Sequence, residues 1–111
     1  MQKNRFQVAP ASERTMDGIV FASKKEMKRY GELKMLERGK VISDLWLQPS
    51  FPVKINDSLF CTYTADFSYV EDGKEVIEEI KSSGTAKDAA YRLRKKAAEL
   101  YYGFKVKVII R

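Results

Sequence analysis

The sequence predicts a mixed α/β domain, of the α+β type with a mixed sheet, whose elements follow the order α-β-β-β-α-β. Two segments carry apolar residues at helical spacing, one in each half of the chain. Extended segments lie between them, and an apolar strand follows the second helix. A strand, a helix and a strand at this spacing predict a right-handed parallel crossover.

One domain is expected over residues 16–111, because no repeat or linker divides them and 111 residues suffice for one core. Residues 1–15 are polar, basic and aperiodic, which predicts a flexible basic arm. No apolar run is long enough to span a bilayer, and no signal-peptide segment follows Met1. The single cysteine, Cys61, fits a reducing compartment, so the cytoplasm is the expected location.

The first helix is predicted from about Lys24 to Arg38. Ser23 and Glu26 have the spacing of a capping box, and Gly39 ends the helix. Glu26 lies in the middle of the apolar stripe of this helix. Two interpretations stay open: Glu26 completes the cap, or it serves a functional site.

Three extended segments follow the first helix. Residues 41–55 read as a bent or edge strand, because Pro49 and Pro52 interrupt them. Residues 59–70 alternate as one strand. Asp72 and Gly73 form a favourable type I′ pair, which predicts a tight hairpin to the return strand "EVIEEIKS".

The second helix is predicted from Thr85 to about Tyr102. Thr85 is the expected cap with Asp88 as its acidic partner, and Gly103 ends the helix. The segment "FKVKVII" is the last strand.

The hairpin register places charged residues on one patch. If Asp72 and Gly73 are the two loop residues, Asp66 falls opposite Glu79, and Lys81 shares their face. Opposed carboxylates repel each other, and a divalent cation would reverse that effect. Glu78 would lie on the apolar side, where an edge or a partner contact is its only expected role.

The amino-acid composition limits the kinds of catalysis that the chain can perform. The chain has no histidine, which excludes Ser-His and Cys-His catalysis and histidine metal sites. Its 21 Lys+Arg against 15 Asp+Glu give a net charge of +6, which favours an anionic partner such as nucleic acid. Phosphate chemistry would then rest on carboxylates that hold Mg²⁺ or Mn²⁺.

Acidic residues from a helix and two strands, beside a lysine, suit the hydrolysis of a phosphodiester. Asp66, Glu79 and the backbone carbonyl of Ile80 are the expected metal ligands, and Glu26 is expected to reach a second ion or an ordered water. Lys81 would position or deprotonate the attacking water. The catalytic set is therefore Glu26, Asp66, Glu79 and Lys81.

The segments "ADF" and "EEIK", separated by a hairpin, match the Asp…Glu-x-Lys pattern of the PD-(D/E)xK nucleases. Together with "GIVFASKKE", "KRYGELKMLERG" and "ISDLWLQPSFPV", the chain resembles small phage-encoded members of that superfamily, related to Holliday-junction resolvases. The resemblance covers residues 17–111. It implies a restriction-endonuclease-like core, a Mg²⁺-dependent endonuclease acting on branched DNA in phage recombination or replication, and the cytoplasm of a bacterial host. Ala65 stands where the superfamily name has proline.

The basic residues of both helices predict contacts with DNA phosphates. The expected nucleic-acid-binding residues are Lys24, Lys25, Gln48, Lys87, Tyr91, Arg92, Arg94, Lys95 and Lys96. Trp46 is expected in the core or in a dimer contact, and a homodimer through residues 45–51 would place two sites for paired cuts. No membrane partner is expected.

Three alternatives remain at this point. The chain is a nucleic-acid-binding module without catalysis, it nicks duplexes or trims ends instead of resolving junctions, or it is an RNase H-like nuclease. The last alternative calls for a longer chain and gives Lys81 no role.

Overall fold

The computed structural model describes residues 9–81 and 89–111, and it confirms a mixed α/β domain. The elements are η1 (Ala11–Arg14), β1 (Thr15–Met16), β2 (Ile19–Val20), α1 (Lys24–Arg38), β3 (Ile42–Leu47), β4 (Ser50–Ile55), β5 (Ser58–Thr64), β6 (Phe67–Glu71), β7 (Lys74–Lys81), α2 (Ala89–Tyr102) and β8 (Lys107–Ile110). Residues 11–15, which the sequence assigned to a flexible arm, form η1 and the start of β1.

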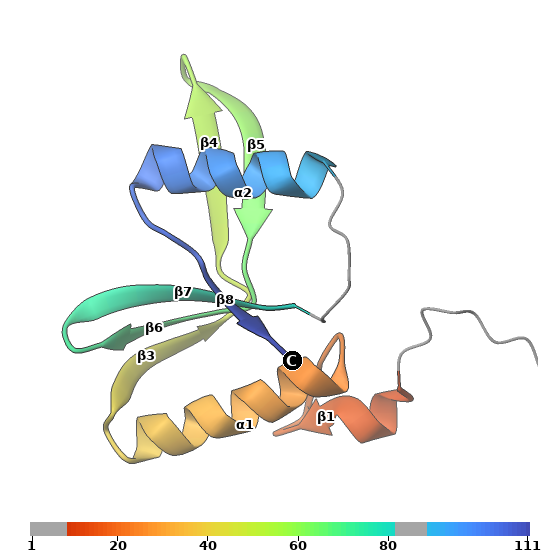
Figure 1. Cartoon of the computed structure of the whole chain (residues 1–111). Helices are drawn as coiled ribbons and strands as arrows, with labels where there is room; N and C mark the ends of the chain where they lie inside the picture. Colours follow the sequence, from red (N-terminus) through yellow and green to blue (C-terminus); the bar gives the residue numbers. More distant parts are fainter. Residues whose placement is uncertain (1–8, 82–88) are drawn as a thin grey trace, which may run out of the picture.

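Four strands form a mixed central sheet in the order β3-β6-β7-β8. The pairings β3–β6 and β6–β7 are antiparallel, and β7–β8 is parallel, so the predicted parallel pairing of the strands before and after α2 is confirmed. Figure 1 shows α1 on one side of this sheet and α2 on the other, lying across the hairpin β4–β5.

The helix boundaries follow their local signals. The helix α1 begins after Ser23, whose side chain accepts a hydrogen bond from the Glu26 amide, and it ends before Gly39 as predicted. The helix α2 ends at Tyr102, followed by Gly103 with φ +78°. Its predicted cap, Thr85, lies outside the described residues.

Two expected strands are each divided in two. Residues 41–55 contain β3 and β4, which part at Gln48 and Pro49. Residues 59–70 contain β5 and β6, which part at Ala65 and Asp66, so the prediction of one continuous strand there is wrong. The strands β4 and β5 thereby form a separate two-stranded sheet, which projects from the central sheet (Figure 1).

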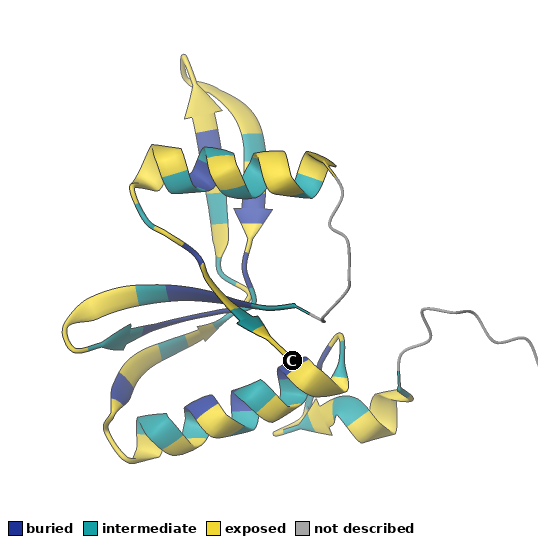
Figure 2. Cartoon of the chain, viewed as in Figure 1, coloured by how far each residue is buried: buried dark blue, intermediate teal, exposed yellow. Residues whose placement is uncertain are grey.

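The central sheet separates two apolar clusters (Figure 2). The cluster on the α1 side consists of Phe21, Tyr30, Leu33, Ile42, Phe67 and Tyr69. The cluster on the α2 side consists of Val53, Tyr63, Ala65, Ile77, Ala98 and Val106. Because neighbouring residues of a strand face opposite sides, the two consecutive glutamates of β7 enter different clusters.

No helix within the described parts of the chain is both long and apolar enough to cross a membrane.

Candidate functional site

Glu78 points to the α1 side of the sheet and is completely buried. Its two carboxylate oxygens each accept a hydrogen bond of 2.8 Å from Arg29, one from Nε and one from Nη2. The Tyr69 hydroxyl donates a third bond of 2.7 Å. A buried carboxylate needs such compensation. Glu78 is therefore an internal ion-pair partner rather than an edge or partner-contact residue.

Glu79 points to the α2 side and is 4% exposed. Its carboxylate accepts hydrogen bonds from the hydroxyls of Tyr63, at 2.5 Å, and of Tyr91. The Nζ of Lys95 lies 3.6 Å from the same carboxylate. Burial and then the hydrogen bond to Glu79 raise the pKa of both tyrosines above the ordinary 10.0, so both remain neutral donors near neutral pH.

Asp66 lies in the bend between β5 and β6, where three backbone groups hold it. Its Oδ2 accepts a 2.7 Å hydrogen bond from the Ile80 amide. Its own amide donates to the Glu78 carbonyl at 3.1 Å, and its carbonyl accepts from the Gln48 amide at 2.8 Å. The chain therefore fixes both the backbone and the carboxylate of Asp66 next to β7.

The hairpin register was predicted correctly from Glu71–Lys74 to Phe67–Glu78. The ladder ends there, because the chain bends at Asp66, so the expected direct pairing of Asp66 with Glu79 does not form.

Glu26 lies in the first turn of α1 and is 8% exposed. Its amide donates to Ser23 Oγ at 3.2 Å, which is one half of the predicted capping box. Its side chain shares the buried face of α1 with Tyr30 and Leu33, as the position within the stripe predicted. Cap formation explains the backbone contact of Glu26, whereas it does not require burial of the side chain.

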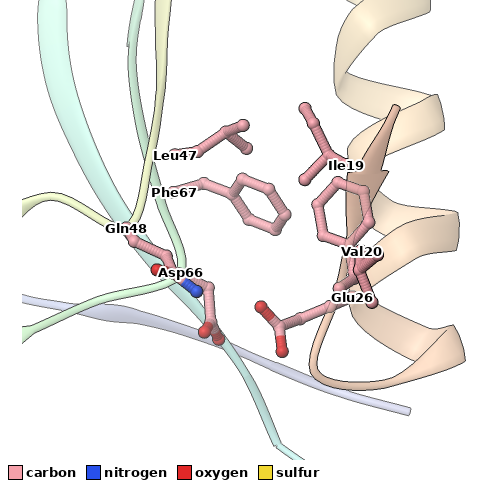
Figure 3. Close-up of a pocket in the computed structure, with 8 residues that line it drawn as sticks. Ile19, Val20, Glu26, Leu47, Gln48, Asp66 and Phe67 are labelled. Atoms are coloured by element: carbon pink, nitrogen blue, oxygen red, sulfur yellow. The ribbon is translucent and has the colours of Figure 1, made fainter. Parts of the chain in front are cut away.

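Glu26 and Asp66 line one pocket of about 270 Å³. Figure 3 shows the two carboxylates directed toward each other, with the Gln48 amide beside Asp66. The remaining lining is apolar and consists of Ile19, Val20, Phe21, Leu47 and Phe67. The pocket therefore has an acidic end and an apolar end.

The structure brings together three of the residues that the sequence selected, Glu26, Asp66 and Gln48. Glu79 and Lys81 do not line this pocket. Within residues 9–81 and 89–111, no three His, Cys, Asp or Glu side chains lie closely enough together to hold a metal, so Glu79 does not join Glu26 and Asp66 in one cluster. The reason is that Glu79 is bonded to two tyrosines on the α2 side.

The predicted phosphate-binding residues fall into three groups. Lys24, Lys25, Arg92 and Lys96 are exposed, as a solvent-facing or DNA-facing role requires. Tyr91 and Lys95 are directed to Glu79 instead. Arg94 is half-buried, and Lys87 lies outside the described residues. Trp46 is 67% exposed on the edge strand β3, so it is not a core residue.

Sequence reasoning missed Arg29 and Tyr63, although both contact a glutamate of β7. The sequence did contain one signal. Two consecutive glutamates in a strand with apolar neighbours face opposite sides of the sheet, and each buried carboxylate needs a hydrogen-bond donor. Nothing in the spacing identified which arginine or tyrosine would supply it.

Comparison with curated proteins and with solved structures gave no match. A family model matches residues 9–111, nearly the whole chain, and its description reads "Protein of unknown function (DUF1064)". The chain therefore belongs to the DUF1064 family.

Proposed function

We propose that this protein is a metal-dependent DNA endonuclease of the PD-(D/E)xK type. The observation that carries the proposal is the pair of carboxylates, Glu26 and Asp66, directed toward each other across one pocket. The Asp66 carboxylate is bonded to the amide of Ile80, the residue between Glu79 and Lys81. The bend before β6 and the strand β7 thus supply the Asp…Glu-x-Lys pattern, and α1 adds Glu26.

The donor set at the acidic end of the pocket suits Mg²⁺ or Mn²⁺. Both ions prefer oxygen ligands, and Mg²⁺ is usually bound through one or two carboxylates while it keeps several waters. Glu26 and Asp66 supply two carboxylates, and a cation between them would offset their repulsion. When bound, the metal would supply Lewis-acid stabilisation of charge on the phosphate.

The residues of the chain have distinct roles in this scheme. Glu26 and Asp66 would hold the cation, and Lys81, at the end of β7, would orient the attacking water. The Glu79 carboxylate also lies near this end of β7, and the hydrogen bonds from Tyr63 and Tyr91 fix its orientation. The exposed cations of α1 and α2 bind the DNA backbone, which gives salt-dependent affinity without reading of sequence.

The preferred substrate in this proposal is branched DNA, including four-way junctions. Cleavage assays should therefore compare a four-way junction, a flap, a nicked duplex, an intact duplex and single strands, each with Mg²⁺, Mn²⁺ or EDTA. Cleavage that requires the metal is expected, and cleavage of branched substrates is expected to be fastest.

Asp66→Asn is the decisive variant. It is expected to abolish cleavage and to leave DNA binding largely intact. The matched control is Asp57→Asn, at an exposed turn with φ +64°, where asparagine is well tolerated. Metal-dependent cutting by Asp66→Asn at the rate of the control would refute the proposal.

A second candidate function is a nucleic-acid-binding module without catalysis. It is favoured by the bonds that Glu79 makes to Tyr63, Tyr91 and Lys95, which give this carboxylate a structural role. Thermal unfolding with added Mn²⁺ discriminates the two functions: a nuclease that binds the ion is stabilised by it, whereas an inert module is not.

A further inference from the structure

The apolar end of the pocket is not explained by metal binding. Ile19 and Val20 of β2, Leu47 of β3 and Phe67 of β6 surround it, and these side chains offer no ligand to a cation or a phosphate (Figure 3). The volume of about 270 Å³ lies just below the range of about 300–1,000 Å³ that drug-sized ligands occupy. A single flat ring system with one polar edge is an occupant of the right size and chemistry.

The surroundings of the pocket indicate a nucleotide rather than an apolar side chain of a protein partner. Lys24 and Lys25, both exposed, directly precede Glu26 in the first turn of α1. The net charge of the chain is +6, which favours a polyanion. At the other side, the Gln48 amide lies next to Asp66 and is able to donate to and accept from a base edge (Figure 3).

We propose that the apolar end of this pocket binds one unpaired nucleobase of a DNA strand whose phosphate lies at the acidic end. This inference rests on the proposed nuclease function and adds a substrate class to it. The base packs against the aliphatic wall of Ile19, Val20 and Leu47, and Gln48 contacts its polar edge.

The consequence for selectivity is steric. A pocket of this size accepts one base and excludes a base pair, so the nucleotide at the site must be unpaired before it enters. Branch points, bulges and single strands supply such nucleotides at low cost, because a base that is already unpaired needs no extrusion from a stack.

Binding to a bulged duplex tests this without relying on cleavage. Three fluorescent duplexes are compared by anisotropy with Ca²⁺, which prefers oxygen ligands as Mg²⁺ does: one with a single unpaired thymidine, one with an abasic sugar at the same bulge, and one fully paired. The wild-type protein is expected to bind the base-containing bulge about 5- to 100-fold more tightly than the abasic bulge, because the base buries apolar surface in the pocket.

Val20→Trp is the variant that fills the pocket. Val20 is 56% exposed, so the larger side chain does not enter the core. The variant is expected to bind the two bulges equally. Leu59→Trp is the matched control, because Leu59 is similarly exposed and lies on the hairpin β4–β5 outside the pocket lining. The control should keep the wild-type preference.

Gln48→Asn is a second variant, which shortens the amide and tolerates the positive φ of +50° at this position. It is expected to reduce affinity differences among the four bulged bases. Equal wild-type affinity for the base-containing and abasic bulges, or no affinity for either, overturns the base-pocket inference. Metal-dependent cleavage in that case would leave the nuclease proposal standing, whereas a bulge preference without cleavage would support the pocket alone.

Discussion

Arg29 and Glu78 form a two-pronged ion pair between α1 and β7, with both hydrogen bonds at 2.8 Å and with Glu78 fully buried. Of the two consecutive glutamates in β7, Glu78 and Glu79, only Glu78 takes part in this ion pair. Because a slip of one residue would exchange the faces of Glu78 and Glu79, the ion pair also specifies which glutamate faces α2.

Removal of Arg29 alone is expected to be strongly destabilising. Arg29→Met leaves the Glu78 charge buried without its cation, which costs about 3–5 kcal/mol. Replacing the whole set by apolar residues, in Arg29→Met/Tyr69→Phe/Glu78→Leu, should recover most of that loss. Chemical denaturation measures both effects. Lys34→Met, which breaks a partly exposed pair with Glu37, is the control and should cost about 0–1 kcal/mol. A loss of stability in Arg29→Met as small as that in Lys34→Met would contradict the prediction.

Glu26→Gln tests the metal role separately from the cap. Glutamine also serves at the third position of a capping box, so the fold should persist. In the wild-type protein, Mn²⁺ at a hundred times its Kd should add about 2.7 kcal/mol of stability. The variant should lose most of this gain, as followed by thermal unfolding. Glu75→Gln, at an exposed position of β7, should keep it. Equal stabilisation of both variants would exclude Glu26 as a ligand.

Two buried tyrosines, Tyr63 and Tyr69, and the half-buried Tyr91 should ionise only at a pH above the ordinary range. Burial is the largest cause that raises the pKa of Tyr63, Tyr69 and Tyr91 above 10.0, and hydrogen bonds to Glu79 or Glu78 add to it. Since the folded pKa lies above the unfolded one, their contribution to stability is complete below pH 10 and is lost as the pH rises further. The absorbance of ionised tyrosine should therefore include these three side chains only when the protein unfolds at alkaline pH. In Tyr63→Phe, the late absorbance should fall by one tyrosine. Titration of all tyrosines in the native state would refute this.

The loss of folding stability at acidic pH depends on Glu32. The hydrogen bond from Arg111, followed by that from Arg29, lowers the pKa of Glu32 from 4.5 to about 2. Because the folded pKa lies below the unfolded one, this stability is present above pH 4.5 and is lost as the pH falls toward 2. Glu32→Gln should flatten the pH dependence of unfolding free energy in that window. An unchanged slope in Glu32→Gln would contradict this prediction.

Local signals predicted the elements that depend on neighbours in sequence. Ser23 and Gly39 define α1, and Asp72 with Gly73 fixes the β6–β7 register, because a cap and a two-residue turn are determined by a few adjacent residues. The burial of Glu26 followed from helical periodicity for the same reason.

Long-range contacts were not predictable in this way. The bend at Ala65 and Asp66 contains neither glycine nor proline. The alternation of apolar and polar residues continues across it, and it therefore predicted one strand over residues 59–70. The partner of Glu78 lies 49 residues away on α1, and only the packing of helix on sheet brings it close. The same holds for Tyr63 and Glu79, which meet because β5 leaves the central sheet. The candidate site was therefore predicted in its residue types and only partly in its geometry.

The bend at Asp66 also has a mechanical consequence. The chain passes between the two sheets at two neighbouring points, which are joined by bonds from the Gln48 amide to the Asp66 carbonyl, at 2.8 Å, and from the Ala65 amide to the Pro49 carbonyl, at 3.1 Å. The helix α2 packs against the hairpin β4–β5 (Figure 1). A polymer bound to this hairpin would therefore load the crossing first, whereas the bonds of Asp66 to the Ile80 amide and to the Glu78 carbonyl keep its carboxylate on the central sheet.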